Sequence, residues 1–122
     1  NISYSQMIEP IPYFYDSINR NAIVVKPKQP LFDWINSIYP DEPVEATNEG
    51  TVYLVKEKDS NEAIEKWLKK NFDNIFQNEL NNWHTDEKDW VQKRTYKLFT
   101  EWFDIEIHSM ILDLEETAIT KD

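Results

Sequence analysis

The chain of 122 residues contains no cysteine and a single glycine, Gly50. Without cysteine it cannot form disulfides, thiolate nucleophiles, iron–sulfur clusters or cysteine-ligated zinc sites. One glycine is too few for the glycine-rich loops that bind dinucleotides or nucleoside triphosphates. No run reaches the roughly 18 apolar residues that a membrane span requires. The first residues show neither the basic region nor the apolar core of a secretion signal. We therefore expect a cytoplasmic protein that does not enter a membrane.

Positive charge is also scarce. Lys and Arg number 13 against 23 Asp and Glu, which gives a formal net charge of −10, and the only arginines are Arg20 and Arg94. Binding to a nucleic acid backbone needs clustered basic side chains, so we do not expect a nucleic acid partner. An acidic surface instead attracts a basic protein by electrostatic steering. The simpler alternative is that the charge serves solubility alone.

Aromatic residues are abundant. Five Trp, six Tyr and six Phe make up 14% of a chain that is 40% apolar, so residues 1–122 are expected to form a single domain with a dense core. Residues 1–20 are predicted to be irregular, and residues 115–122 to form a polar tail. The first segment either completes the core or exposes a binding patch; its proline and aromatic residues are Pro10, Pro12, Tyr4, Tyr13, Phe14 and Tyr15.

Two β-branched runs predict strands over residues 22–26 and 51–56. Between them, apolar residues at helical spacing predict a helix from about Gln29 to Ile38, because Pro30 suits a first helical position and Pro40 stops the helix. Such a helix permits a right-handed parallel crossover between the two strands. An acidic loop follows this helix and contains Asp41, Glu42, Glu45 and Glu49.

A long helix is predicted to begin at Asp59. Asp59 is a good N-cap, and Glu62 three residues later completes a capping box. The polar run 81–86 ends the helix. Its apolar residues recur at helical spacing and form one core-facing stripe: Ile64, Trp67, Leu68, Phe72, Ile75, Phe76, Leu80 and Trp83.

The last third of the chain predicts a helix over residues 88–102 and a strand over residues 105–114. Apolar residues occupy both alternating sets of positions in this strand, so we expect it at the centre of the sheet. The order strand, helix, strand, helix, helix, strand indicates an α+β fold. Its small sheet has about three strands and packs with two to three helices.

Glu106 and His108 are two residues apart on the last predicted strand and therefore share a face. There they either ligate a metal or act as an acid–base pair, or they form a structural pair. His84, in a second polar cluster, could join them only through a tertiary contact. The candidate metal ligands are thus His84, Glu106 and His108, with Asp104 or Asp113 as further ligands if they converge. No catalytic signature occurs, so we assign no catalytic or cofactor-binding residue and expect no cofactor.

The run EWFDIEIHSM at residues 101–110 resembles a group of small bacterial proteins. The similarity extends from residues 19–22 through residues 30–34 to residues 113–114. No activity is established for that group, so the resemblance implies none for this chain.

We therefore expect a non-enzymatic protein-binding domain whose acidic surface contacts a basic protein, as an immunity protein, an antitoxin or a regulatory partner does. This expectation depends on whether the acids of residues 41–49 and of the long helix form one contiguous face, because a scattered distribution would remove most of the case for it. One alternative is a small metal-binding protein or metal-dependent enzyme that uses Glu106 and His108. Another is a subunit of a homodimer or larger homo-oligomer that buries an aromatic face.

Overall fold

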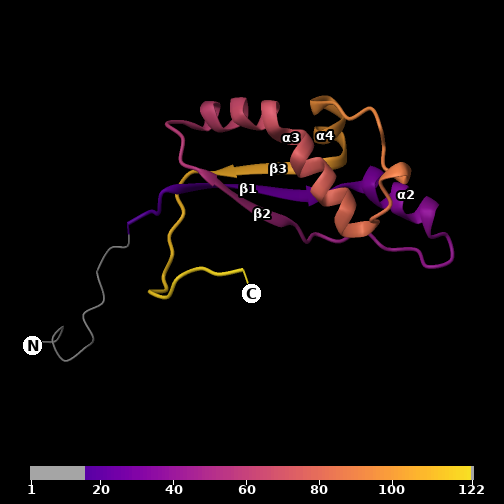
Figure 1. The fold of residues 1–122 in the computed structure, drawn as a ribbon, viewed down its shortest axis with the longest axis horizontal. Coiled ribbons are helices and arrows are strands. Elements are labelled where there is room, and N and C mark those ends of the chain that lie inside the picture. The colour runs from indigo at the N-terminus through magenta and orange to yellow at the C-terminus, as the bar shows by residue number, and fades with distance from the viewer. Residues whose placement is uncertain (1–15, 122) are drawn as a thin grey trace, which may run out of the picture.

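The computed structural model describes residues 16–121 (Figure 1). The fold is α+β, as the sequence predicts, with one three-stranded antiparallel sheet in the order β2-β1-β3. In chain order its elements are β1 (Arg20–Pro27), α2 (Gln29–Ile38), β2 (Thr51–Lys56), α3 (Asn61–Trp83), the 3-10 helix η1 (Glu87–Asp89), α4 (Tyr96–Trp102) and β3 (Phe103–His108).

The two faces of the sheet differ in what covers them. Ile23 and Val25 of β1 are fully buried and face α3 and α4, which lie along one side of the sheet in Figure 1. Side chains alternate between faces along a strand, so the neighbouring positions point to the other side. On that side Val52 is 59% exposed and Leu54 45% exposed. No helix among the described residues covers this second face, which we call the open face.

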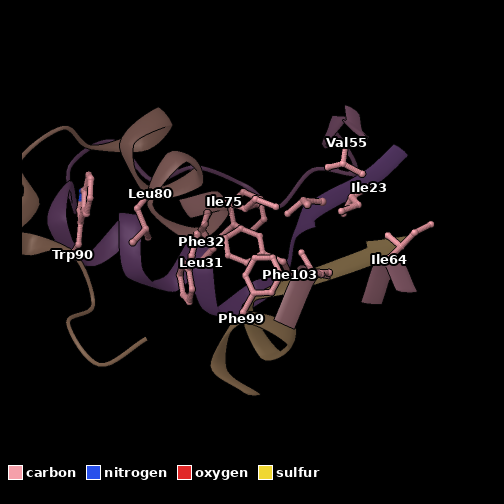
Figure 2. Packing of buried hydrophobic residues seen from close by; sticks show 13 residues of the cluster. Ile23, Leu31, Phe32, Val55, Ile64, Ile75, Leu80, Trp90, Phe99 and Phe103 are labelled. Atoms are coloured by element: carbon pink, nitrogen blue, oxygen red, sulfur yellow. The ribbon is translucent and has the colours of Figure 1, made fainter. Parts of the chain in front are cut away.

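The core lies between the covered face of the sheet and the helices (Figure 2). Aromatic rings dominate its centre: Phe76 packs edge-on against Phe103 at 5.3 Å between ring centroids, and Phe99 lies 5.4 Å from Phe103. Each buried ring removes a large apolar area from water, so few positions suffice for a small domain. The stripe predicted on the long helix is confirmed, because its members are either buried or packed against this core.

Both predicted helices over the first two-thirds of the chain exist, but the cap of the longer one was wrong. Ser60, not Asp59, is the N-cap of α3, and its hydroxyl accepts a hydrogen bond from the main-chain N–H of Ala63. Because the helix begins one residue later, Glu62 falls at its second position and cannot complete a capping box. Glu62 still favours the helix there through its charge near the positive end of the helix dipole.

The predicted helix over residues 88–102 is two shorter elements, η1 and α4. Asp86 caps η1, and Thr95 caps α4 by accepting from the N–H of Leu98. Between them, side chains donate hydrogen bonds to main-chain carbonyls that would accept from main-chain N–H groups in a continuous helix. Gln92 donates to the carbonyl of Trp90, and Arg94 donates to that of Val91. Local side-chain hydrogen bonds of this kind compete with the helical ladder.

The parallel crossover that a helix between the first two strands permits does not form, because β1 and β2 are antiparallel. Figure 1 shows that α2 extends beyond the end of the sheet and does not cross its face. The chain therefore leaves the sheet at the end of β1 and re-enters it as β2 at the same end of the sheet, where Thr51 lies opposite Val25. Gly50 makes this return possible: a Cβ there would lie 2.8 Å from the carbonyl oxygen of Val25.

The last strand is neither central nor as long as predicted. β3 ends at His108 and occupies an edge of the sheet, while β1 is the central strand. Asn21 marks the point where β3 stops: its side chain is 1% exposed, donates to the carbonyl of Ser109 and accepts from the N–H of Lys58. It thus links the ends of both outer strands. Beyond Ser109 the chain is not a strand, and Met110 is 75% exposed.

Candidate functional site

A polar arrangement that links several elements surrounds His84, the C-cap of α3. Its Nδ1 lies 2.8 Å from the hydroxyl of Tyr39, and its Nε2 lies 2.9 Å from Oδ2 of Asp89. A carboxylate only accepts hydrogen bonds, so Nε2 carries the proton and, in the neutral ring, Nδ1 accepts from the Tyr39 hydroxyl. The His84 side chain is only 12% exposed. His84 therefore joins α2, α3 and η1 through both ring nitrogens.

Two tryptophans hold the same junction. The indole N–H of Trp34 donates to the carbonyl of Asp89 at 3.0 Å, and that of Trp90 donates to the carbonyl of His84 at 2.7 Å. The Tyr39 ring meets the imidazole edge-on at 5.4 Å between centroids. Tyr39 is nevertheless 44% exposed. The junction thus presents an exposed aromatic ring whose position is fixed by its neighbours.

Acidic residues lie in both of the segments that the Tyr39–His84 hydrogen bond brings together. Residues 39–42 form a turn, closed by a hydrogen bond from the N–H of Glu42 to the carbonyl of Tyr39. The Tyr39–His84 bond brings this turn next to residues 84–89. The turn and residues 86–89 together hold five carboxylates and one lysine, all of them exposed. We call this region, residues 39–42 and 86–89, the acidic end of the molecule.

The electrostatics of the acidic end follow from local hydrogen bonds. The main-chain N–H of Lys88 donates to the Asp86 carboxylate and lowers its pKa, with a smaller contribution from the Lys88 ammonium 3.4 Å away. Asp86 is therefore ionised throughout the physiological range. Because Lys88 is engaged with Asp86, it does little to offset the remaining acids.

The acids of α3 do not extend this surface. Asp73 bonds to Arg94 at 2.6 Å, which lowers the pKa of the Asp73 carboxyl, and Glu79 is buried. Glu62 and Glu65 lie near the start of the helix, and at 1.5 Å per residue Glu65 is roughly 28 Å from His84. The acids of the loop and of the long helix therefore do not form one contiguous face, which removes most of the case that rested on such a face. The acids that join the loop come from η1 instead.

Glu106 and His108 are neighbours on the open face, as their spacing predicts. Nε2 of His108 lies 3.3 Å from Oε1 of Glu106, and Nζ of Lys26 lies 3.3 Å from Oε2. His108 and, to a smaller extent, Lys26 lower the pKa of the Glu106 carboxyl. The side chains of Glu106 and His108 are 44% and 54% exposed. This is a water-exposed polar pair on an edge strand.

The candidate metal ligands do not converge. His108 pairs with Ala22 near the start of β1, whereas His84 contacts α2 beyond the far end of that strand (Figure 1). Within residues 16–121 no group of three or more His, Asp or Glu side chains is placed to hold a metal ion. The aromatic patch predicted around Tyr4 and residues 13–15 lies outside the described residues.

Glu79 is a buried acid that the sequence reasoning missed. It is 2% exposed and accepts a hydrogen bond from the hydroxyl of Tyr53, which also accepts from the side chain of Asn78 at 2.9 Å. Burial raises the pKa of Glu79, and the bond from Tyr53 partly opposes that shift. Burial and the contact with Glu79 also raise the pKa of Tyr53. The pair ties β2 to α3.

Signals for two of the missed residues exist in the sequence. Glu79 lies four residues after Ile75 and three after Phe76, which places it on the buried stripe of the helix. Asp89 lies five residues after His84, within reach of a local hydrogen bond. Tyr39 is 45 residues from its partner, and no spacing rule connects them.

Comparisons of the chain with models of known protein families, with curated proteins and with solved structures give no match. Within residues 16–121 no helix has both the length and the hydropathy of a membrane span.

Proposed function

We propose that the protein is a non-enzymatic binding domain that recognises a basic protein through its acidic end. The observation that carries this proposal is Tyr39, an exposed ring that His84 holds where two acidic segments meet. The proposal includes a cytoplasmic location, which suits a chain without cysteine. A basic toxin or a basic enzyme under regulation is the kind of partner whose charge fits this surface.

Tyr39 has the properties of an interface anchor. Tyrosine is enriched among the residues that contribute most to binding energy in protein complexes. A side chain already fixed in one rotamer loses little conformational entropy on binding, and its hydrogen bond to His84 fixes Tyr39 in this way. The ring can pack against the aliphatic part of an arginine or lysine, or under its charge.

The carboxylates of the acidic end supply the long-range part of recognition. Asp41, Glu42 and Glu87 form no ion pair within residues 16–121, so their charges face water. Complementary charge raises the rate of encounter and excludes acidic partners. Because salt screens exposed charges over about 10 Å at 0.1 M ionic strength, binding should weaken as salt rises.

The test compares two variants of equal net charge. The first, Asp41→Asn/Glu42→Gln/Glu87→Gln, removes three charges from the acidic end and leaves Asp86 and Asp89 to hold η1 and His84. The matched control, Glu62→Gln/Glu65→Gln/Glu101→Gln, removes three charges from exposed positions on α3 and α4. Each protein is used to capture partners from a lysate of its source organism at low and high salt.

We expect the wild type and the control to retain one stoichiometric basic protein at low salt, and the acidic-end variant to lose it. Equal retention by the two variants would show that the acidic end is not the contact surface. Equal loss by both would show that net charge alone governs capture, which also contradicts the proposal.

A homo-oligomeric subunit is the second candidate, because one specific observation favours it. Val52 and Leu54 expose apolar side chains side by side on the open face of β2, which is an edge strand. An edge strand with an apolar face is a common site of association. Light scattering over a range of protein concentrations tests this candidate, and a monomer at all concentrations would exclude it.

A further inference from the structure

A hollow of about 460 Å³ lies where β1 begins and β2 ends. The residues among 16–121 that line it are Asn19, Arg20, Lys56 and Glu57. α2 follows the opposite end of β1, so the hollow and the acidic end are at opposite ends of the central strand (Figure 1). The hollow is therefore separate from the proposed protein-binding surface.

Two cations face each other across this hollow. Arg20 and Lys56 are directly opposite partners in the antiparallel register of β1 and β2. Directly opposite residues share a face, with Cβ atoms about 4.5–5.5 Å apart, and like charges in this arrangement destabilise a sheet. In a chain with a net charge of −10, an acid at either position would relieve the repulsion. The pair thus opposes stability unless something anionic lies between them.

Asn19 orients the Arg20 guanidinium. Nη1 of Arg20 donates to the main-chain carbonyl and to the side-chain oxygen of Asn19, both at 2.9 Å. Only one of the three guanidinium nitrogens takes part in these bonds, so Nε and Nη2 keep their donors. Within residues 16–121 neither Arg20 nor Lys56 forms an ion pair, although Glu57 lines the same hollow.

The other arginine of the chain shows the contrast. Arg94 is committed to the fold: its Nε donates to Asp73 at 2.6 Å, and its Nη1 donates to the carbonyl of Val91. Arg20 makes no such contact with an acid in the described part of the chain. No side chain or carbonyl of residues 16–121 accepts from its Nε or Nη2, and these donors can bind a ligand.

We propose that this hollow binds an oxyanion group, a carboxylate or a phosphate, of a small molecule. The planar guanidinium of Arg20 donates two parallel hydrogen bonds, and the Lys56 ammonium supplies a third contact as a point charge. The ligand charge replaces the repulsion between the two cations with attraction to both. α3 begins at Asn61, four residues after Glu57, so the positive end of its dipole lies at the same end of the sheet.

The test titrates the isotope-labelled full chain with sodium phosphate and, separately, with sodium acetate, each at constant ionic strength. Amide shifts of residues 19–21 and 56–58 are followed in the wild type, in Arg20→Gln and in Lys70→Gln. Lys70 is an exposed residue of α3, and its variant removes the same charge away from the hollow.

We expect saturable shifts in the wild type with at least one of the two anions, and the stronger anion identifies the group that the site prefers. Arg20→Gln should weaken binding of that anion at least about tenfold, because it removes both charge-assisted hydrogen bonds of the guanidinium. Lys70→Gln should leave the affinity unchanged. Absence of saturation with both anions, or equal weakening by both variants, would overturn the proposal.

Thermal unfolding provides a second measurement that does not depend on the spectra. Without ligand, Arg20→Gln should melt at the same temperature as the wild type or higher, because it removes a like-charge contact. The anion that binds should raise the melting temperature of the wild type and not that of Arg20→Gln. A variant that melts lower without ligand would show that Arg20 stabilises the fold, against the proposal.

Discussion

Two regions of the molecule each contain one glutamate and one histidine, in opposite surroundings. Near the end of α3, Glu79 is 2% exposed and the His84 side chain is 12% exposed. On β3, the side chains of Glu106 and His108 are 44% and 54% exposed. The sequence made the β3 pair the more prominent candidate, because it stands in an apolar run. In the structure, however, Glu79 and His84 are the two residues that are mostly buried and hydrogen-bonded to other elements.

The carboxyl groups show what the difference in burial does. Burial raises the pKa of Glu79, whereas His108 and Lys26 lower the pKa of Glu106. The same residue type thus resists ionisation in one place and favours it in the other. Glu79 and His84 are thus packed mostly inside the molecule, whereas Glu106 and His108 lie on its solvated surface. Variants of each pair test this distinction.

The largest effect is expected for His84→Ala. The change removes hydrogen bonds to Tyr39 and Asp89 and the ring between them. We expect a loss of about 2–3 kcal/mol of unfolding free energy, the sum of two hydrogen bonds and the lost packing. Urea unfolding at neutral pH measures it. A loss no larger than that of His108→Ala would remove the distinction between the two histidines.

Glu79→Gln should stabilise the protein at neutral pH by about 1–2 kcal/mol, because it keeps an acceptor for Tyr53 and removes a buried charge. The raised pKa of Glu79 means that the folded state holds this proton more tightly than the unfolded state. Wild-type stability from this group is therefore greatest below the unfolded pKa of about 4.3. It falls as pH rises through the folded pKa. The extra stability of Glu79→Gln should therefore appear as pH rises from the unfolded pKa through the folded pKa, and it should vanish at lower pH. Extra stability that does not depend on pH would contradict a raised pKa for Glu79.

Tyr39→Phe separates the hydroxyl from the ring. The variant keeps the packing against His84 and loses one hydrogen bond, so we expect a loss of about 1 kcal/mol of unfolding free energy. Calorimetry at neutral pH measures it. A change as large as that of His84→Ala would mean that the hydroxyl, and not the imidazole, holds the junction together.

The smallest effects are expected on β3. His108→Ala should change the unfolding free energy by less than about 0.5 kcal/mol, as surface ion pairs usually do. Glu106→Gln should show a pH dependence opposite in sign to that of Glu79→Gln. Because the folded state lowers the pKa of Glu106, its contribution is present above the unfolded pKa and is lost as pH falls. Thermal unfolding from acid to neutral pH measures both variants, and a large loss in either would place this pair in the packing.

Local patterns were sufficient for the first four elements, β1, α2, β2 and α3. The stripe from Ile64 to Leu80 predicted α3, and the run at residues 51–56 predicted β2, since hydrophobic periodicity reports directly which face is buried. They were not sufficient for the sheet order. The apolar run over residues 105–114 predicts a central strand, but β3 ends at His108 on an edge of the sheet, and Asn21 bonds to the carbonyl of the next residue, Ser109. That contact spans 88 residues and has no local signal.

The candidate site was less predictable for the same reason. The spacing of Glu106 and His108 predicted their contact, because two residues apart on a strand share a face. The Tyr39–His84 bond joins the end of α2 to the end of α3 and exists only because the chain packs those helix ends together. The acidic loop was found in the sequence, but its neighbouring acids in η1 depend on that same packing.

The central claim is that the acidic end, with Tyr39 as its anchor, binds a basic protein. The most direct measurement is the affinity of the captured partner for the wild type, for Tyr39→Ala and for Val52→Ala/Leu54→Ala on the open face. The account predicts at least about a tenfold loss for Tyr39→Ala, typical of an interface anchor, and unchanged affinity for the open-face variant. Unchanged affinity for Tyr39→Ala together with a loss for the open-face variant would contradict it.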